Sequence, residues 1–89
     1  MTDRPGDETS GLAALGTAIR TLRAQADLTE DQLGRRAQVS PELLREVEEG
    51  RREPTWGDLR RIAGGLETPL EQLLELAESL ESAGPGAPA

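Results

Sequence analysis

Apolar residues recur at intervals of three and four through the middle of the chain, and they nowhere alternate strictly with polar residues. Spacing of three and four places side chains on one face of an α-helix, whereas strict alternation would indicate a β-strand. The pattern therefore predicts an all-α protein. We expect helices over residues 11–26, 29–37, 41–49, 55–65 and 69–81.

Capping residues and glycines support these boundaries. A Thr, Ser, Asp or Asn side chain at the start of a helix accepts a hydrogen bond from a free backbone N–H, and Gln, Glu or Asp three positions later completes a capping box. Such starts are predicted at Thr29 with Gln32, Ser40 before Pro41, Thr55 with Asp58, and Thr68 with Glu71. Glycine endings are predicted at Gly50 and at Gly64–Gly65.

The apolar faces of these helices define a predicted core built almost entirely from aliphatic residues. Its members are Leu15, Ile19, Leu22, Leu28, Leu33, Ala37, Val39, Leu44, Val47, Leu59, Ile62, Ala63, Leu66, Leu70, Leu73 and Leu74. Trp56 is the only aromatic residue. We expect it to be a partly buried anchor at the start of the fourth helix, in preference to a platform on which nucleic-acid bases stack.

The two ends of the chain are polar and contain proline and glycine, so they cannot bury enough apolar surface to order themselves. Residues 1–10 and 82–89 are predicted to be flexible tails, which leaves a single domain over residues 11–81. No apolar run has the length of a signal peptide or a membrane span. This indicates a cytoplasmic protein without a membrane partner.

Composition excludes several kinds of chemistry. The chain has no cysteine and no histidine, so disulfides, thiolate metal sites, Cys nucleophiles and His general bases are ruled out. No convergent set of catalytic groups is apparent. We therefore expect no enzyme activity, no catalytic residue, no metal and no cofactor.

The net charge of −7 argues against non-specific binding of nucleic acid, which favours a basic surface. The charge is unevenly distributed, however. Residues 28–65 contain eight acids and seven arginines, whereas residues 66–89 contain five glutamates and no cation. The middle of the chain is therefore close to neutral.

The segment from Leu15 to Leu74 resembles the phage-repressor-like (Xre-type) helix-turn-helix family. The matching residues are Arg20 and Arg23, Leu28–Thr29, Leu33, Val39–Ser40, Glu48, Gly50 and Pro54. The resemblance implies a compact five-helix, lambda-repressor-like domain with a motif over residues 29–50 and a recognition helix over 41–49. It also implies a DNA-binding transcriptional regulator, nucleoid-associated in the cell, in which Arg23 and Glu48 form a structural ion pair.

A helical projection of residues 41–49 places Leu43, Leu44 and Val47 on one side and the polar residues on the other. The outward positions near the start of such a helix reach base edges in the family, and here they are Pro41, Glu42 and Glu46. Phosphate contacts are expected from the residues around them. These are Arg35, Arg36, Ser40, Arg45, Arg51 and Arg52.

The acidic residues of this face keep a second function open. Glu30, Asp31, Glu42, Glu46 and Glu49 would weaken binding to DNA and would suit a protein-binding module on the same fold, such as an anti-repressor, an antitoxin-like partner or an adaptor. Glu30 and Asp31 also have a simpler explanation, because acids in a first turn complement the helix dipole.

The fifth predicted helix carries a broad apolar stripe. Its members are Leu70, Leu73, Leu74, Leu76, Ala77 and Leu80. The stripe has two interpretations of similar weight, a homodimer contact through residues 69–81 or a longer core helix. A two-fold dimer would suit half-sites one helical turn apart.

Overall fold

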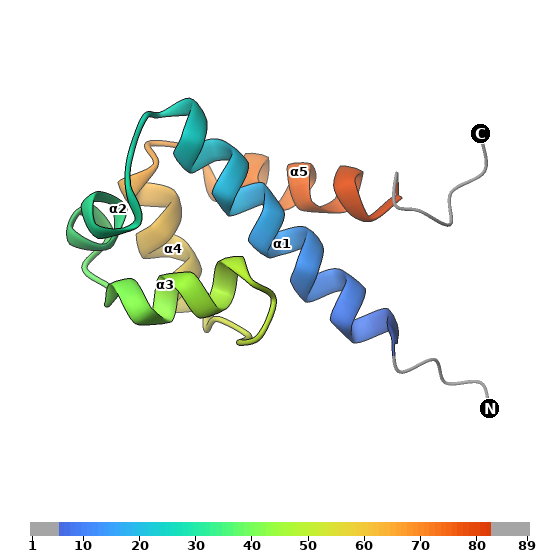
Figure 1. Cartoon of the computed structure of the whole chain (residues 1–89). Coiled ribbons are helices and arrows are strands. Elements are labelled where there is room, and N and C mark those ends of the chain that lie inside the picture. Colours follow the sequence, from blue (N-terminus) through green and yellow to red (C-terminus); the bar gives the residue numbers. More distant parts are fainter. Residues whose placement is uncertain (1–5, 83–89) are drawn as a thin grey trace.

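The computed structural model describes residues 6–82, and every regular element in that range is a helix (Figure 1). The elements are α1 (Gly6–Gln25), α2 (Glu30–Ala37), α3 (Pro41–Glu48), α4 (Trp56–Gly65) and α5 (Leu70–Ser82). This confirms the all-α prediction. All five predicted helices are present.

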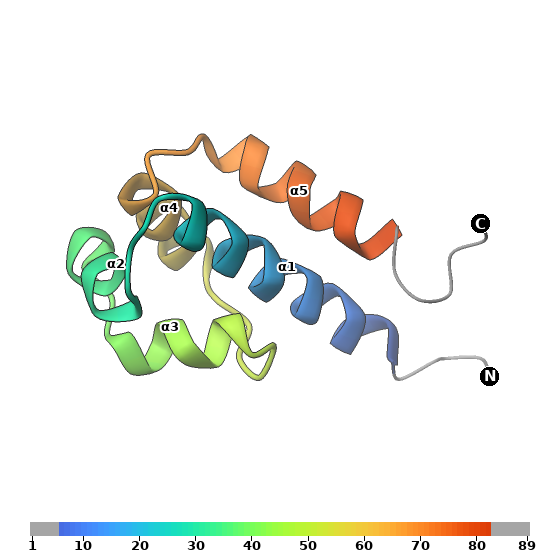
Figure 2. The same ribbon diagram turned by 45° about the horizontal axis from the view of Figure 1, so that its top comes forward.

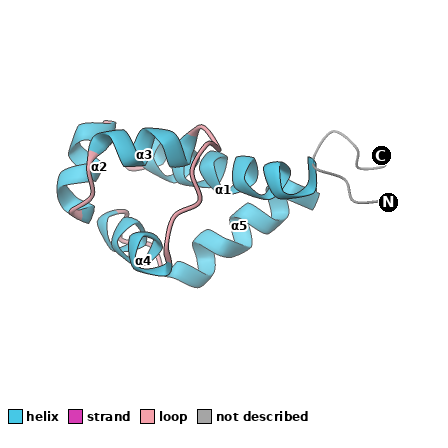
Figure 3. Cartoon of the chain, turned by 90° about the horizontal axis from the view of Figure 1, so that it is seen from below, coloured by secondary structure: helices cyan, strands magenta, loops and turns pink. Residues whose placement is uncertain are grey.

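Two long helices and three short ones divide the domain. α1 and α5 run side by side, whereas α2, α3 and α4 gather at one end of α1 (Figures 1 and 2). Viewed from below, α2 and α3 lie on one side of the domain and α4 on the other (Figure 3). In this arrangement α3 packs on both α1 and α2, while α4 packs against α2 and α5.

The core lies where these helices meet. Ten of the sixteen predicted core residues are buried, among them Ile19, Leu33, Leu44 and Leu73. Five more are partly buried against the core, and Leu74 is partly buried without belonging to that cluster. Ala18 and Ala77 complete the buried set.

The first helix is longer than the sequence pattern predicts. α1 begins at Gly6, five residues before the expected start at residue 11. The remaining parts of the expected tails, residues 1–5 and 83–89, lie outside the described residues.

α4 ends at Gly65 as predicted, but two of the residues expected to mark helix ends have other roles. Thr68 lies one position too early to cap α5, and its hydroxyl instead donates to the Leu66 carbonyl at 3.2 Å. After α4, the residue in the left-handed region is Glu67, with φ of 55°, rather than a glycine. Gly65 is buried where an added Cβ would lie 2.9 Å from Leu33 Cδ1. Close packing of α4 on α2 therefore accounts for a glycine at this position.

Gly50 has the predicted role just after the end of α3. Its φ of 76° is in the left-handed region that glycine adopts without strain. A second glycine, Gly16, is required by packing. A Cβ on Gly16 would collide with the carbonyl oxygens of Val47 and Glu48, so this position allows α1 to lie directly against the end of α3.

No helix within residues 6–82 is both long enough and apolar enough to cross a lipid bilayer.

Candidate nucleic-acid interface

The helix-turn-helix unit is formed by α2, a short turn and α3. Thr29 and Gln32 form the predicted capping box at the start of α2, with hydrogen bonds of 2.8 and 3.0 Å. α2 ends at Ala37, and the next residue, Gln38, caps it with a left-handed φ of 61° that turns the chain. Ser40 then caps α3, because its hydroxyl accepts a hydrogen bond from the Leu43 N–H at 3.0 Å.

The two faces of α3 have different surroundings. Leu44, Val47 and Glu48 are buried and point into the domain. Glu42, Arg45 and Glu49 are exposed. The outward face is therefore available to a partner, as the helical projection predicts.

Glu48 is the one buried charged residue among the described side chains, with an exposed side-chain fraction of 1%. Its carboxylate accepts two hydrogen bonds from the guanidinium of Arg23, from Nε at 2.7 Å and from Nη2 at 3.0 Å. Arg20 adds a hydrogen bond to the Glu48 carbonyl oxygen at 3.2 Å. These contacts join α1 to the last turn of α3.

The pair has a clear electrostatic signature. Hydrogen bonding to Glu48 raises the pKa of Arg23, and this outweighs the opposing effect of burial. Arg23 also donates to the Leu28 carbonyl at 3.0 Å. The resulting network satisfies a charge that would be costly to bury alone.

Four of the five arginines predicted to contact phosphate are paired with a carboxylate. Arg45 Nε lies 3.5 Å from Glu30 Oε1, and Arg52 Nε lies 2.6 Å from Glu46 Oε1. The other two contacts are Arg51 with Glu49 at 2.9 Å and Arg36 with Glu67 at 3.8 Å. No ion pair within the described residues includes Arg35, which is exposed on α2.

These pairs bring several predicted site residues together. Arg45 and Glu30 join α3 to the first turn of α2, and Arg52 in the following loop reaches back to Glu46 on α3. Pro41 and Glu42 lie in the first turn of α3 beside the Ser40 cap. Arg36 instead points toward the residues after α4, where its partner Glu67 lies.

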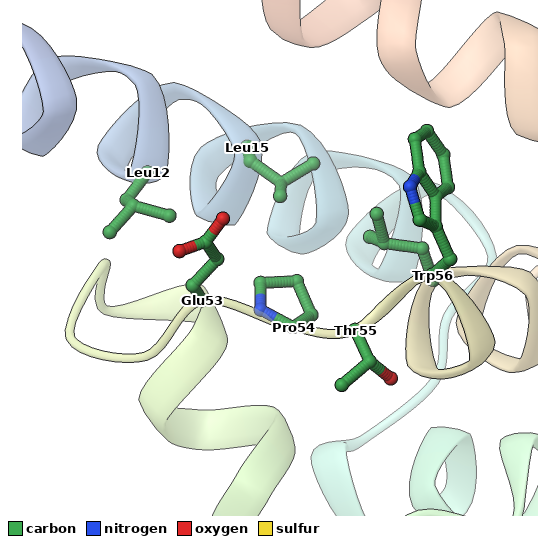
Figure 4. Close-up of a pocket in the computed structure, with 7 residues that line it drawn as sticks. Leu12, Leu15, Glu53, Pro54, Thr55 and Trp56 are labelled. Carbon is green, nitrogen blue, oxygen red and sulfur yellow. The ribbon is translucent and has the colours of Figure 1, made fainter.

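The position of Trp56 differs from the prediction. It is 62% exposed rather than a partly buried anchor, because it is the first residue of α4, at the surface. The preceding Pro54 is buried and is the residue that anchors this loop. Trp56 forms one wall of a cleft of about 570 Å³ between α1 and the loop before α4 (Figure 4). The residues lining this cleft include none from α2 or α3.

The apolar stripe of α5 is largely used inside the domain. Leu73 and Ala77 are buried, and Leu70, Leu76 and Leu80 pack against the core. This arrangement favours the longer core helix over a dimer contact.

The ion pairs of the outward face were not identified by sequence reasoning. Arg52 and Glu46 are six residues apart across a helix end, and Arg45 and Glu30 are fifteen apart across the turn. Neither separation matches the three- or four-residue spacing of a helix, so the sequence pattern could not indicate these pairs. The role of Gly16 was also missed, although a glycine inside a helical pattern is itself a sign of close packing.

A profile of the helix-turn-helix domain family matches residues 14–76 of this chain. No curated protein sequence matches it significantly.

Several solved structures are similar to this chain over most of its length. A crystal structure of the clp gene regulator ClgR from Corynebacterium glutamicum is 32% identical, with a TM-score of 0.73 over 78% of this chain and 90% of that one. A second ClgR structure is 30% identical, with a TM-score of 0.79 over 82% of this chain and 78% of that one. The restriction-modification controller protein C.AhdI from Aeromonas hydrophila, at 22% identity, shares the fold, with a TM-score of 0.69 over 70% of this chain and 94% of that one.

The family profile spans well over half of the chain and includes the capped α2–α3 motif. The protein therefore belongs to the phage-repressor-like (Xre-type) helix-turn-helix family, whose members are DNA-binding transcription regulators.

Proposed function

We propose that this protein regulates transcription in the cytoplasm by placing the outward face of α3 in a DNA major groove. The observation that carries the proposal is the division of α3. Its inner face is buried and joined to α1 through Glu48, while Glu42 and Arg45 face outward. A short helix held from behind and exposed in front is the geometry by which such motifs read base edges.

Within this proposal, phosphates are contacted by the residues around the rim of the motif. Those residues are Arg35, Arg36, Ser40, Arg45, Arg51 and Arg52. Pro41, Glu42 and Glu46 lie nearest the bases. A glutamate can take part in such readout because its carboxylate accepts a hydrogen bond from cytosine N4.

The nearly neutral motif sets the expected strength of binding. Each arginine that neutralises a phosphate releases counterions, so affinity falls with salt concentration according to the number of such contacts. Because acids and arginines are interspersed over residues 28–65, we expect weak non-specific binding. Selectivity must then come from shape and base contacts on α3.

The test begins with selection of bound fragments from the source genome. A selected duplex is then labelled and titrated by fluorescence anisotropy at several salt concentrations. Arg45→Ala should weaken binding and reduce the salt slope by about one contact. Arg60→Ala is the matched control, because it removes the same charge from an exposed position on α4, outside the motif.

Failure to recover any duplex, even at low salt, would contradict the proposal. It would support the second candidate, in which the acidic residues on this face meet a basic protein surface. That candidate has one specific observation in its favour, the pairing of Arg45, Arg51 and Arg52 with neighbouring carboxylates.

A homodimer through residues 69–81 remains part of the proposal, although most of the α5 stripe is occupied by the core. Leu74 is the stripe residue that lies partly exposed outside the core cluster. If α5 forms the contact, Leu74→Glu should shift the sedimentation coefficient from dimer to monomer. An unchanged monomer in both proteins would refute this contact.

A further inference from the structure

Glu46 occupies a position that the proposed function assigns to base readout, but the structure commits its carboxylate to another group. Arg52 Nε donates to Glu46 Oε1 at 2.6 Å, the shortest ion pair among the described residues. Hydrogen bonding and charge attraction from Arg52 lower the pKa of Glu46 below its ordinary value. The carboxylate is therefore charged at neutral pH and has a partner already.

Arg52 likewise already has an anionic partner on its Nε–H. A guanidinium binds an anion most strongly through two neighbouring N–H donors on one edge of its rigid fork, whether the anion is a carboxylate or a phosphate. In the free protein that anion is Glu46. A phosphate on DNA would have to displace or share a carboxylate that competes for the same Nε–H group.

We infer that Glu46 is an intramolecular competitor of the DNA phosphate for Arg52 and thereby limits affinity, rather than a residue that reads a base. This rests on the proposed function, because it concerns how the same surface binds DNA. A similar contact between Glu30 and Arg45 at 3.5 Å extends the arrangement to the other end of the motif. Glu30 and Glu46 would then hold the arginines in place while weakening their attraction to arbitrary DNA sequences.

The consequence is a surface on which neighbouring carboxylates offset the charge of the arginines until a DNA phosphate lies close enough to replace them. Exposed ion pairs are individually weak and are screened by salt, so the competition can be overcome by a well-placed phosphate. Poorly placed phosphates would not overcome it. Affinity for arbitrary sequences therefore falls more than affinity for the operator.

The two roles of Glu46 predict opposite signs for one substitution. If Glu46 competes for Arg52, Glu46→Gln should tighten binding of the selected duplex about three- to tenfold, because it frees a phosphate ligand and removes a repulsive charge. If Glu46 accepts a hydrogen bond from a base, Glu46→Gln should weaken binding or change the preferred sequence. The latter result would overturn the inference.

A double-mutant cycle separates competition from simple repulsion. Removing the carboxylate reduces repulsion whether or not Arg52 is present, but it releases Arg52 only when Arg52 is present. The gain from Glu46→Gln should therefore fall to about twofold in an Arg52→Ala background. Equal gains in both backgrounds would show that the two residues do not compete and would refute the inference.

Glu75→Gln provides a charge control, since it removes one exposed carboxylate on α5, away from the motif. We expect it to change affinity less than Glu46→Gln does, and an equal gain would again refute a specific role. Duplex bound by wild type with no gain in Glu46→Gln would contradict only this inference. Absence of binding by every variant at low salt would contradict the proposed function together with the inference.

Discussion

Replacing Glu48 by glutamine tests whether the buried ion pair with Arg23 holds α3 in place against α1. The substitution preserves the size of the side chain but removes its charge. One carboxylate oxygen now accepting a hydrogen bond from Arg23 would become an NH₂ group that faces a guanidinium donor. Arg23 would then keep its charge while losing its main partner, with only 18% of its side chain exposed.

The magnitude follows from how far each group is withdrawn from water. Removing one partner of a fully buried pair costs about 3 to 5 kcal/mol, because the other charge is left uncompensated. Arg23 retains some hydration and its bond to the Leu28 carbonyl, so we expect a loss of about 2 to 4 kcal/mol. In a domain of this size, that lowers the melting temperature by about 10 to 30 °C.

The assay is urea unfolding followed by far-ultraviolet circular dichroism, since the described domain is helical. Glu53→Gln is the control, because Glu53 is exposed and takes part in no ion pair within the described residues. It should change stability by less than about 0.5 kcal/mol. A Glu48→Gln effect as small as that of the control would refute the argument. A cycle with Arg23→Gln should give losses that are less than additive.

Three further predictions concern packing, capping and titration. Gly16→Ala should destabilise the domain by about 1 to 3 kcal/mol in thermal unfolding, because its Cβ meets the main chain of α3, whereas Gly64→Ala, with open space around it, should be neutral or slightly stabilising. Ser40→Ala should cost about 1 kcal/mol in urea unfolding by removing the cap of α3, and an unchanged midpoint would contradict the capping assignment. Carboxyl resonances followed by NMR should give Glu46 a pKa below its ordinary 4.5, returning toward 4.5 in Arg52→Ala. Because the pKa of Glu46 is lower in the folded than in the unfolded protein, the stability from this contact is present above pH 4.5 and is lost as the pH falls through the folded pKa. A Glu46 pKa that is not lowered would argue against the contact.

Most features with a local physical cause were predictable from the sequence, although the cap predicted at Thr68 was wrong. Capping boxes depend on side chains three residues apart, and the caps at Thr29 and Thr55 were placed correctly for that reason. Ser40 was predicted from the preference for serine just before a helix that begins with proline, and Gly50 from its conformational freedom. The apolar periodicity likewise identified the inner face of α3.

Features that depend on how distant segments meet were not predictable in the same way. Periodicity could not show that Trp56 would remain exposed while Pro54 became buried, because that depends on how the loop crosses α1. The same holds for the partners of Arg45 and Arg52, which are set by the turn geometry. The Arg23–Glu48 contact was expected only through a family resemblance, since no local rule links residues 25 positions apart.

The separation of inner and outer residues on α3 has a consequence for engineering and for evolution. Folding depends on Leu44, Val47 and Glu48, whereas the proposed recognition of DNA uses exposed side chains such as Glu42 and Arg45, which are not part of the core. The two sets share no member. New target preferences can therefore be sought by randomising the exposed side chains of a single eight-residue helix, without changing the buried residues that keep the helix in position.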